Sequence, residues 1–312
     1  MKKIITLLLV LIIGVGILSG CTEKSNLEKL VVTYVTSPLN IPTMVERDKQ
    51  IFNENIKSME IPVEYAEITS GADQTQALAS GDVQVLYGVG ATSVILSAAN
   101  GADIKVLNMY SRSPKAFAMY SKDVNINTPQ DLKDKTIAGP VGTNLHQMLI
   151  AYLASANMSI EDVNYVNMSI PDSKAGLDGG SVDIALLAGP IAYTAQQQGY
   201  KLVADGEGLI DAIIAVAVTE KFYTENKAVI EALIKSQDEI SKFMNENYDE
   251  TVSIAAKTLD IEEQAVKDMY AYYDFSTTIS EKDIEGFQRT ADFMFESGMI
   301  ENAMDVKTLF LN

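Results

Sequence analysis

Short apolar runs rich in β-branched residues alternate along this chain with stretches in which apolar residues recur every three or four positions. Runs of the first kind are typical of buried strands, and the second spacing is typical of amphipathic helices. Their alternation predicts an α/β fold with mostly parallel sheets. The predicted strands are 30–35, 61–68, 83–87, 104–110, 136–139, 163–168, 182–187 and 200–204, and the helices between them include 44–56, 92–99 and 145–156.

The pattern changes after Asp211. One apolar run, 212–218, has the length of a strand, and the remainder has helical spacing almost throughout, with Gly298 as a helix stop. A helical tail of this length needs a sheet or lobe on which to pack. We therefore expect the chain to return to its first set of strands after it has built the second set.

Two parts of the chain are similar in sequence, with matching residues at a constant separation. Each copy reads as a turn, a short helix closed by glycine, a buried strand, and a glycine that opens the next helix. This similarity indicates two lobes of similar build. The alternative is two α/β units that share periodicity without common ancestry. The matching pairs are Ser70 with Ser169, Asp73 with Asp172, Leu78 with Leu177, Gly81 with Gly180, Val83 with Val182, and Gly90 with Gly189.

The amino terminus combines a basic start, an apolar run over residues 4–18, and the sequence Leu18-Ser19-Gly20-Cys21. The run is too short to span a membrane, and its flanks are those of a signal peptide. Small residues before the sole cysteine resemble the lipobox of bacterial lipoproteins. This resemblance implies a signal peptide at 1–20, lipidation of Cys21, a tether at 21–29, and a place on the extracytoplasmic face of the cell membrane. The alternative is a buried helix with an incidental cysteine.

Composition excludes several functional classes. The 312 residues include 24 Lys and Arg against 42 Asp and Glu, a formal charge of -18, which argues against nucleic-acid binding. Cys21 and His146 are the only residues of their types, which excludes disulfide scaffolds and metal centres built from several Cys or His residues. No catalytic dyad is visible, and Asp205 and Glu207 share one turn in which they are solvated or face a cationic ligand. We therefore expect a protein without cofactor, metal or enzymatic activity.

Three segments resemble the extracytoplasmic binding proteins for aliphatic sulfonates, taurine and nitrate. They are TSGADQTQALASGDVQVLYGVGATS at 69–93, DLKDKTIAGPVGTNLH at 131–146, and the helical stretch 226–250. The resemblance implies a two-lobed periplasmic-binding-protein-like fold of type II, with two crossover segments and a helical C-terminal tail. One lobe would comprise 30–112 plus 214–312, and the other 113–213. The sequence departs from the family pattern in Asp134, where glycine is usual, and in its lack of tryptophan.

In such lobes a ligand binds where strands end and helices begin, because free backbone N–H groups lie there. Glycines in these loops let the backbone approach a ligand closely. An ordinary strand-to-helix turn is the alternative for each loop. In the first lobe the candidates are Thr36, Ser37, Ser70, Gly71, Gln74, Gly88, Gly90, Ala91 and Thr92.

The second lobe supplies Gly142, Thr143, Asn144, His146, Ser169, Gly189 and Tyr193. His146 is expected to be a neutral N–H donor, since protonation at a helix amino terminus is disfavoured; a satisfied, partly buried histidine is the alternative. Tyr193 faces the cleft or packs on the surface of its lobe. Arg112 is either the ionic partner of an anionic ligand or part of the hinge surface.

Taken together, the sequence predicts a monomeric solute receptor that delivers a small polar or anionic molecule, of sulfonate, taurine or nitrate type, to an ABC permease and its ATPase subunits. The same scaffold could instead bind a neutral or cationic heterocycle, such as a pyrimidine precursor of thiamine, or an amino acid. An extracytoplasmic enzyme and an adhesin lipoprotein are the alternatives from other classes.

Overall fold

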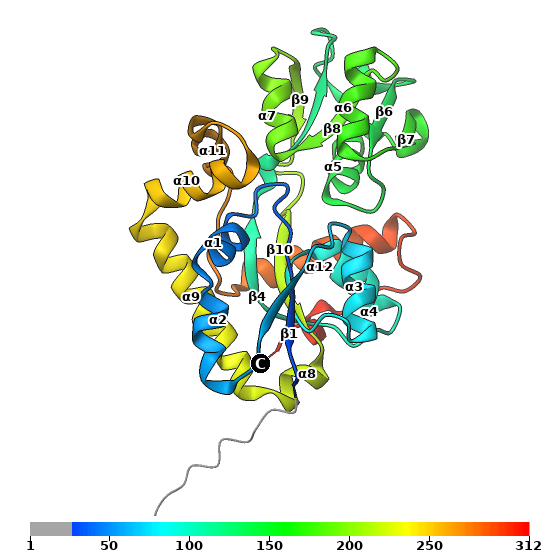
Figure 1. Ribbon diagram of the computed structural model, residues 1–312. Helices are drawn as coiled ribbons and strands as arrows, with labels where there is room; N and C mark the ends of the chain where they lie inside the picture. Colours follow the sequence, from blue (N-terminus) through cyan, green and yellow to red (C-terminus); the bar gives the residue numbers. More distant parts are fainter. Residues whose placement is uncertain (1–26, 312) are drawn as a thin grey trace, which may run out of the picture.

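The computed structural model describes residues 27–311, which form two α/β lobes lying one above the other in Figure 1. The signal-peptide, lipidation and tether predictions fall on residues 1–26 for the most part, outside the described residues. Lobe 1, the lower one, contains strands β1 (Leu30–Thr33), β2 (Val63–Ala66), β3 (Leu86–Gly90), β4 (Lys105–Arg112) and β10 (Ile213–Val218). Lobe 2 contains β5 (Phe117–Ser121), β6 (Thr136–Gly139), β7 (Asn164–Asn167), β8 (Ile184–Ala188) and β9 (Lys201–Asp205).

Most helices belong to lobe 1. They are α1 (Ile41–Lys49), α2 (Ile51–Ile56), α3 (Gly71–Ser80), α4 (Ala91–Ala99), α8 (Glu220–Glu225), α9 (Lys227–Glu246), α10 (Tyr248–Leu259), α11 (Glu263–Tyr270) and α12 (Glu281–Glu296). Lobe 2 has α5 (Asn144–Ala154), α6 (Ile170–Gly179) and α7 (Gly189–Gln197). Short 3-10 turns cover Lys57–Met59, Pro114–Ala116, Pro129–Leu132, Ile160–Asp162 and Val306–Leu309.

The two lobes have the same strand order. Lobe 2 reads β7-β6-β8-β5-β9; in lobe 1 β2-β1 is joined to β3-β10-β4 by a parallel bridge between Val32 and Val85. In each lobe the fourth strand arrives from the other lobe and runs antiparallel to both neighbours. Four strands of each lobe therefore run in one direction, as expected for mostly parallel sheets, and the crossover strand makes each sheet mixed because it enters from the opposite end.

The two parts of the chain that are similar in sequence also have matching structure, one part in each lobe. Helices α3 and α6 are offset by 99 residues, and both end on a glycine in the left-handed region, Gly81 and Gly180. The strands and helices that follow, β3-α4 and β8-α7, are also counterparts. Each strand end leads directly into a helix, so the carboxyl ends of β3 and β8 are equivalent places in their lobes.

Two crossover segments join the lobes and lie against each other. Ser113 follows β4 and donates a backbone hydrogen bond of 3.3 Å to the carbonyl of Ala212, which precedes β10. A Cβ on Gly206 would lie 2.6 Å from the carbonyl oxygen of Pro114, so the second segment can pass the first only with glycine there. The connection between the lobes is thus a pair of adjacent backbone segments in direct contact.

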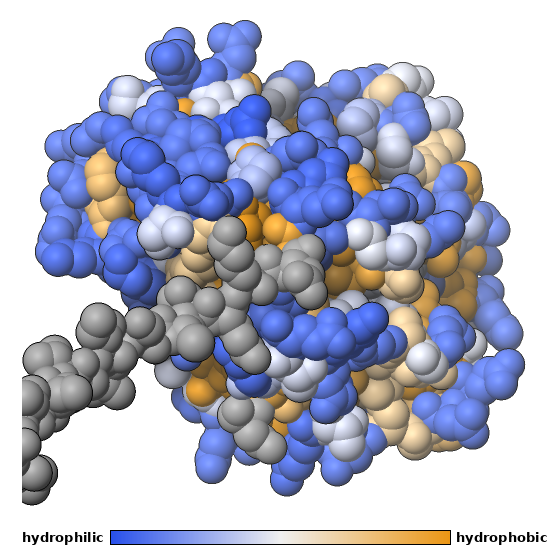
Figure 2. Space-filling view, turned by 60° about the horizontal axis from the view of Figure 1, so that its bottom comes forward, coloured by the Kyte–Doolittle hydropathy of each residue, from blue (hydrophilic) through white to orange (hydrophobic). Residues whose placement is uncertain are grey.

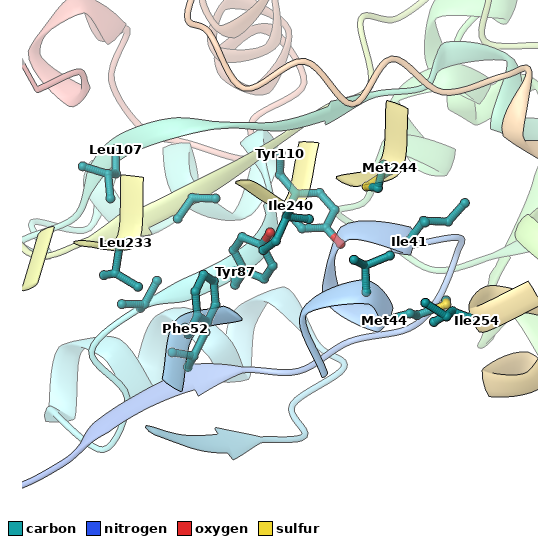
Figure 3. Packing of buried hydrophobic residues seen from close by; sticks show 14 of the residues in the cluster. Ile41, Met44, Phe52, Tyr87, Leu107, Tyr110, Leu233, Ile240, Met244 and Ile254 are labelled. Carbon is teal, nitrogen blue, oxygen red and sulfur yellow. The ribbon is translucent and has the colours of Figure 1, made fainter. Parts of the chain in front are cut away.

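Lobe 1 has an aromatic centre that joins its sheet to its helices (Figure 3). The ring of Tyr87 in β3 contacts Phe52 of α2 and Tyr110 of β4 edge to face, at centroid distances of 5.2 and 5.0 Å. The Tyr110 hydroxyl contacts Thr43 Oγ1 at 2.8 Å and accepts a bond from the Thr43 backbone N–H. This centre fixes α1, and with it the loop between β1 and α1.

The face shown in Figure 2 is predominantly hydrophilic, with separate apolar patches. Within residues 27–311, no helix has the length and apolar character that crossing a membrane requires. Where the chain was expected to form a helical tail, α8, α9, α10 and α12 pack on lobe 1, but α11 also contacts α7 of lobe 2. Strand β5 was missed in the sequence because its five residues follow a proline turn and show no alternation.

Glu46 is a carboxyl group buried in lobe 1, with 1% of its surface exposed. It accepts hydrogen bonds from the backbone N–H of Phe52 and the hydroxyl of Tyr65. Burial raises the pKa of Glu46 to about 7, against the lowering effect of these bonds. Because the folded pKa lies above the unfolded value of 4.5, the contribution of this group to stability is complete below pH 4.5 and is lost as the pH rises through about 7.

Replacing Glu46 with glutamine should remove this pH dependence. Between pH 4.5 and pH 8 the free energy of unfolding of the wild type should fall by up to about 3 kcal/mol relative to Glu46→Gln, measured by urea denaturation at each pH. Glu231→Gln, on the exposed face of α9, is the matched control and should follow the wild type. Parallel pH curves for wild type and Glu46→Gln would contradict the assignment.

Candidate functional site

The lobes touch where the chain leaves β1 and where α7 begins. Gly189 has φ +59°, and a Cβ built on it would lie 2.3 Å from the carbonyl oxygen of Pro38. A side chain at this position would therefore hold the lobes apart. The contact brings the loop after β1, which contains the candidate Ser37, and the first turn of α7, which contains the candidate Gly189, to the same place between the lobes.

Two side-chain hydrogen bonds extend the contact. The hydroxyl of Tyr193 donates to Asp268 Oδ2 of α11 at 3.0 Å, and Gln147 Nε2 of α5 donates to Thr290 Oγ1 of α12 at 3.5 Å. Gln147 and Thr290 are both buried. Helices α7 and α5 of lobe 2 thus rest on α11 and α12 of lobe 1.

Three of the predicted loops meet in lobe 1. Asn40 Nδ2 donates to the carbonyl of Ser37 at 3.2 Å and lies 3.7 Å from a Cβ built on Gly88. A Cβ on Gly71 would overlap Ser93 of α4, so the start of α3 lies against the first turn of α4. Because β1 and β3 run parallel, these loops share the edge of the sheet that faces lobe 2.

The loop before α5 folds around His146. The backbone N–H of Gly142 donates to His146 Nδ1 at 3.3 Å, and the imidazole stacks on Tyr165 at a centroid distance of 4.9 Å. Burial lowers the pKa of His146 from its ordinary value of 6.5, so the ring is neutral at pH 7. Since Nδ1 accepts a hydrogen bond, the ring proton resides on Nε2, which is a donor.

Helices at the interlobe edges divide into capped and uncapped ones. The hydroxyl oxygens of Ser70 and Ser169 accept from the N–H groups of Asp73 and Asp172, which caps α3 and α6 and places an acidic residue in each first turn. The serines are therefore capping residues of their helices. A cap and a carboxylate at a helix start leave little attraction for an anion.

Helices α4, α5 and α7 begin differently. Each lacks a side-chain cap hydrogen bond and has no acidic residue in its first turn. Their N-cap positions are Gly90, Thr143 and Ala188, and the Thr143 hydroxyl donates to the carbonyl of Pro140 instead of accepting from the helix. The first-turn N–H groups of α4 and α5, including those of Ala91, Thr92 and Asn144, remain available for a ligand. The first turn of α7 offers fewer, because Pro190 has no N–H.

Arg112 has a structural role. Its guanidinium donates five hydrogen bonds, to both carboxylate oxygens of Asp283, to the carbonyl and hydroxyl of Ser276, and to the carbonyl of Thr278. A guanidinium has five N–H donors, so none remains for a ligand. Burial acts to raise the pKa of Asp283, but bonds from Arg112 and Ser280 outweigh it and lower that pKa. The suggested ionic bond between Arg112 and a ligand is therefore wrong, and the hinge alternative holds.

Two further candidates are placed as follows. Gln74 is buried inside lobe 1, where its Nε2 donates to the carbonyl of Ile68. Thr36 accepts a backbone bond from Asn40 and forms part of the turn after β1. Within residues 27–311, no group of three His, Cys, Asp or Glu side chains could hold a metal ion.

A small cavity beside the hinge contains residues that the sequence reading missed. It has a volume of about 20 Å³ and includes Gly189 and Tyr193 with Tyr120, Tyr272 and Tyr273. The cavity could have been anticipated from one aromatic-rich sequence, Tyr-Ala-Tyr-Tyr-Asp-Phe at 270–275.

Residues 41–249 match the model of the NMT1/THI5-like family, and this segment is more than half of the chain. The chain belongs to the NMT1/THI5-like family. Its relatives include an Escherichia coli (strain K12) protein named as an aliphatic sulfonates-binding protein, 22% identical over 98% of this chain and 96% of the relative. The taurine-binding periplasmic protein of the same strain is 28% identical over 60% of this chain and 59% of its own length.

Solved structures establish the fold. The periplasmic aliphatic sulphonate binding protein of Escherichia coli superposes with a TM-score of 0.81 at 20% identity, over 91% of this chain and 92% of that chain. The desulfurization enzyme DSZB superposes with a TM-score of 0.70 at 15% identity, over 90% and 96%. The NMT1/THI5-like chain therefore has the fold of periplasmic binding proteins, a fold that also serves an enzyme.

Replacing Gly189 with alanine should open the molecule. Gly189→Ala places a methyl group against the Pro38 carbonyl, whereas Gly180→Ala introduces the same left-handed strain, about 1 kcal/mol, into open space. Both variants should lose a little thermal stability, but only Gly189→Ala should increase the radius of gyration in small-angle X-ray scattering. Identical scattering from both variants and the wild type would show that this contact does not set the lobe spacing.

Proposed function

We propose that this protein is the solute-binding component of an ABC importer and that it holds a small sulfonate-type anion between its two lobes. The observation that carries the proposal is that α4, α5 and α7 all begin at the edges where the lobes meet, without side-chain caps and without acidic residues. Membership of a family whose relatives are named for sulfonate and taurine binding supports the same ligand class.

Backbone dipoles suit a sulfonate group. Three oxygens share one charge, and helix starts offer several N–H donors that point in fixed directions. The chain carries a formal charge of -18 and Arg112 is fully engaged, so local donors must overcome a repulsive overall field. His146 Nε2 adds a neutral donor beside the start of α5.

Capture depends on closure. A solute that contacts α4 of lobe 1 and α5 and α7 of lobe 2 stabilises the closed arrangement more than an open one, which shifts the population toward closure. The bond from Tyr193 to Asp268 and the contact of Gly189 with Pro38 join the two lobes and support such an arrangement. The closed form is then the one that a permease with ATPase subunits receives, and the receptor acts as a monomer.

We also propose that Cys21 carries the lipid anchor, after removal of residues 1–20. The described chain begins at the base of lobe 1, at the end farthest from lobe 2 (Figure 1). An anchor attached there leaves both faces of the interlobe contact free. Acyl chains hold such a protein at the membrane without a spanning helix.

Catalysis has weaker support than binding. The Nδ1 atom of His146 accepts a hydrogen bond from the Gly142 backbone N–H, so this atom is not paired with a carboxylate as that of a general base would be. Burial also lowers the pKa of His146. Asp205 accepts from the backbone N–H of Glu207, and Glu207 pairs with Lys115, so both carboxylates serve the local turn.

Titration calorimetry should detect binding of methanesulfonate and taurine at one site per chain. Ethylamine, which carries the opposite charge, should give no saturable heat, because the uncapped helix starts attract anions only. Glycine and a thiamine-precursor pyrimidine test the other solute classes. Binding of the pyrimidine or of glycine, with no heat from either sulfonate, would overturn the sulfonate proposal.

Replacing His146 with leucine should weaken methanesulfonate binding about tenfold, the loss of one hydrogen bond to a charged group. His146→Gln keeps a donor and should lose less, and Gln76→Leu on the exposed face of α3 is the control. Because the pKa of His146 is lowered, wild-type affinity should stay constant from pH 7 to 9. Equal affinities for wild type and His146→Leu would exclude His146 from the site.

A further inference from the structure

Ala212, in the second crossover segment, has an unusual backbone conformation. Its φ is +48°, in the left-handed region that a residue with a Cβ seldom adopts. Five other non-glycine residues within residues 27–311 have a positive φ, but all five are polar and none of them is buried, whereas Ala212 is only 3% exposed. A strained backbone at a buried position persists only where the surrounding contacts hold it.

The neighbours of Ala212 are held on lobe 1, whereas its side chain packs in lobe 2. Asp211 accepts two hydrogen bonds from Arg289 of α12, at 2.8 and 3.0 Å, and Ile213 pairs with Arg112 of β4 in the sheet of lobe 1. The methyl group of Ala212 belongs to the apolar core cluster of lobe 2. Ala212 is thus the residue at which the chain passes from the packing of one lobe to that of the other.

Ser113, in the first crossover segment, carries a second unfavourable feature. Its side chain is fully buried, and the hydroxyl has no hydrogen-bond partner within residues 27–311. A buried hydroxyl without a partner has lost its hydrogen bonds to water and gained none in return. The backbone N–H of Ser113 donates to the carbonyl of Ala212, so the unpaired hydroxyl and the strained backbone belong to two residues that are hydrogen-bonded to each other.

We infer that this hinge stores strain in the arrangement in which the lobes are in contact, and that Ala212 and Ser113 thereby set the affinity for the solute. A hinge absorbs changes in φ and ψ at a few residues when lobes move. When the lobes separate, φ of Ala212 returns to a negative value and water reaches the Ser113 hydroxyl. The inference rests on the proposed function, because the strain opposes the closure that captures a solute.

The strain lowers the apparent affinity by a simple rule. A solute that requires the lobes in contact binds less tightly by the fraction of free molecules that already have this arrangement. Any change that removes strain from the hinge raises this fraction, and it strengthens binding without touching a group that contacts the solute. Ala212 and Ser113 are therefore positioning residues, which act on the solute through the distance between the lobes.

Titration calorimetry of the full chain in mild detergent, with methanesulfonate as the probe, tests the inference. Ala212→Gly accommodates a φ of +48° without strain and should tighten binding about three- to tenfold. Ser113→Ala removes the unpaired hydroxyl and should tighten binding by a similar factor. The methyl group lost in Ala212→Gly packs within lobe 2, so its loss should lower the melting temperature while the gain in affinity remains.

Each hinge variant has a control that makes the same chemical change outside the crossover segments. Asp260→Gly replaces another left-handed residue, with φ +55°, at the end of α10. Ser111→Ala removes a buried hydroxyl in β4 that likewise lacks a partner among the described residues. Both controls should retain the wild-type affinity for methanesulfonate.

Small-angle X-ray scattering of the free protein gives a readout that needs no solute. Ala212→Gly should have a smaller radius of gyration than the wild type, because more molecules have their lobes in contact, and Asp260→Gly should not. If the wild type binds methanesulfonate, then unchanged or weaker binding by both hinge variants, or equal tightening by their controls, would overturn the strained hinge and leave the sulfonate receptor standing.

If the wild type does not bind methanesulfonate, the proposed function fails, and the scattering of Ala212→Gly then decides the fate of the hinge. A contraction relative to the wild type and Asp260→Gly would retain the strained hinge without its solute. An unchanged radius would reject it as well.

Discussion

The arrangement depends on how the two crossover segments are held side by side. The backbone bond from Ser113 to Ala212 joins them, and the five hydrogen bonds of Arg112 fix one of them to α12 and to the segment after α11. These bonds fix the pivot between the lobes on lobe 1. Gly189 then meets Pro38, and the first turns of α5 and α7 come to rest opposite lobe 1.

The identical strand order of the lobes explains why the site lies between them. Each lobe ends β3 or β8 directly in a helix start, and each exposes that end at the edge facing its counterpart. Within each lobe one helix start is closed by a serine cap and the next is left open. Both lobes thus contain the same structural unit, and in each lobe the uncapped helix start faces the space between the lobes.

The sequence predicted most strands, the return of the chain to lobe 1 and the loops that meet between the lobes, because periodicity and glycine positions are local signals. It did not predict that β5 and β10 are antiparallel, since strand direction is decided by the path between lobes. Capping of α3 by Ser70 and of α6 by Ser169 could be predicted from the Asp three positions later. That capped helix starts attract an anion less than uncapped ones becomes clear only when α3 and α6 are compared with α4 and α7. The partners of Arg112 lie about 170 residues away, beyond any local pattern.

The full engagement of Arg112 has a consequence for the medium in which the protein works. A receptor that binds an anion through a mobile guanidinium loses affinity when dissolved ions compete for the charge. Here the proposed donors are amide dipoles and a neutral imidazole, which have no counterions to release and are screened little when the lobes exclude water. Dissolved salt also screens the repulsion from the formal charge of -18, so such a receptor would capture an anionic solute at least as well in saline as in dilute surroundings.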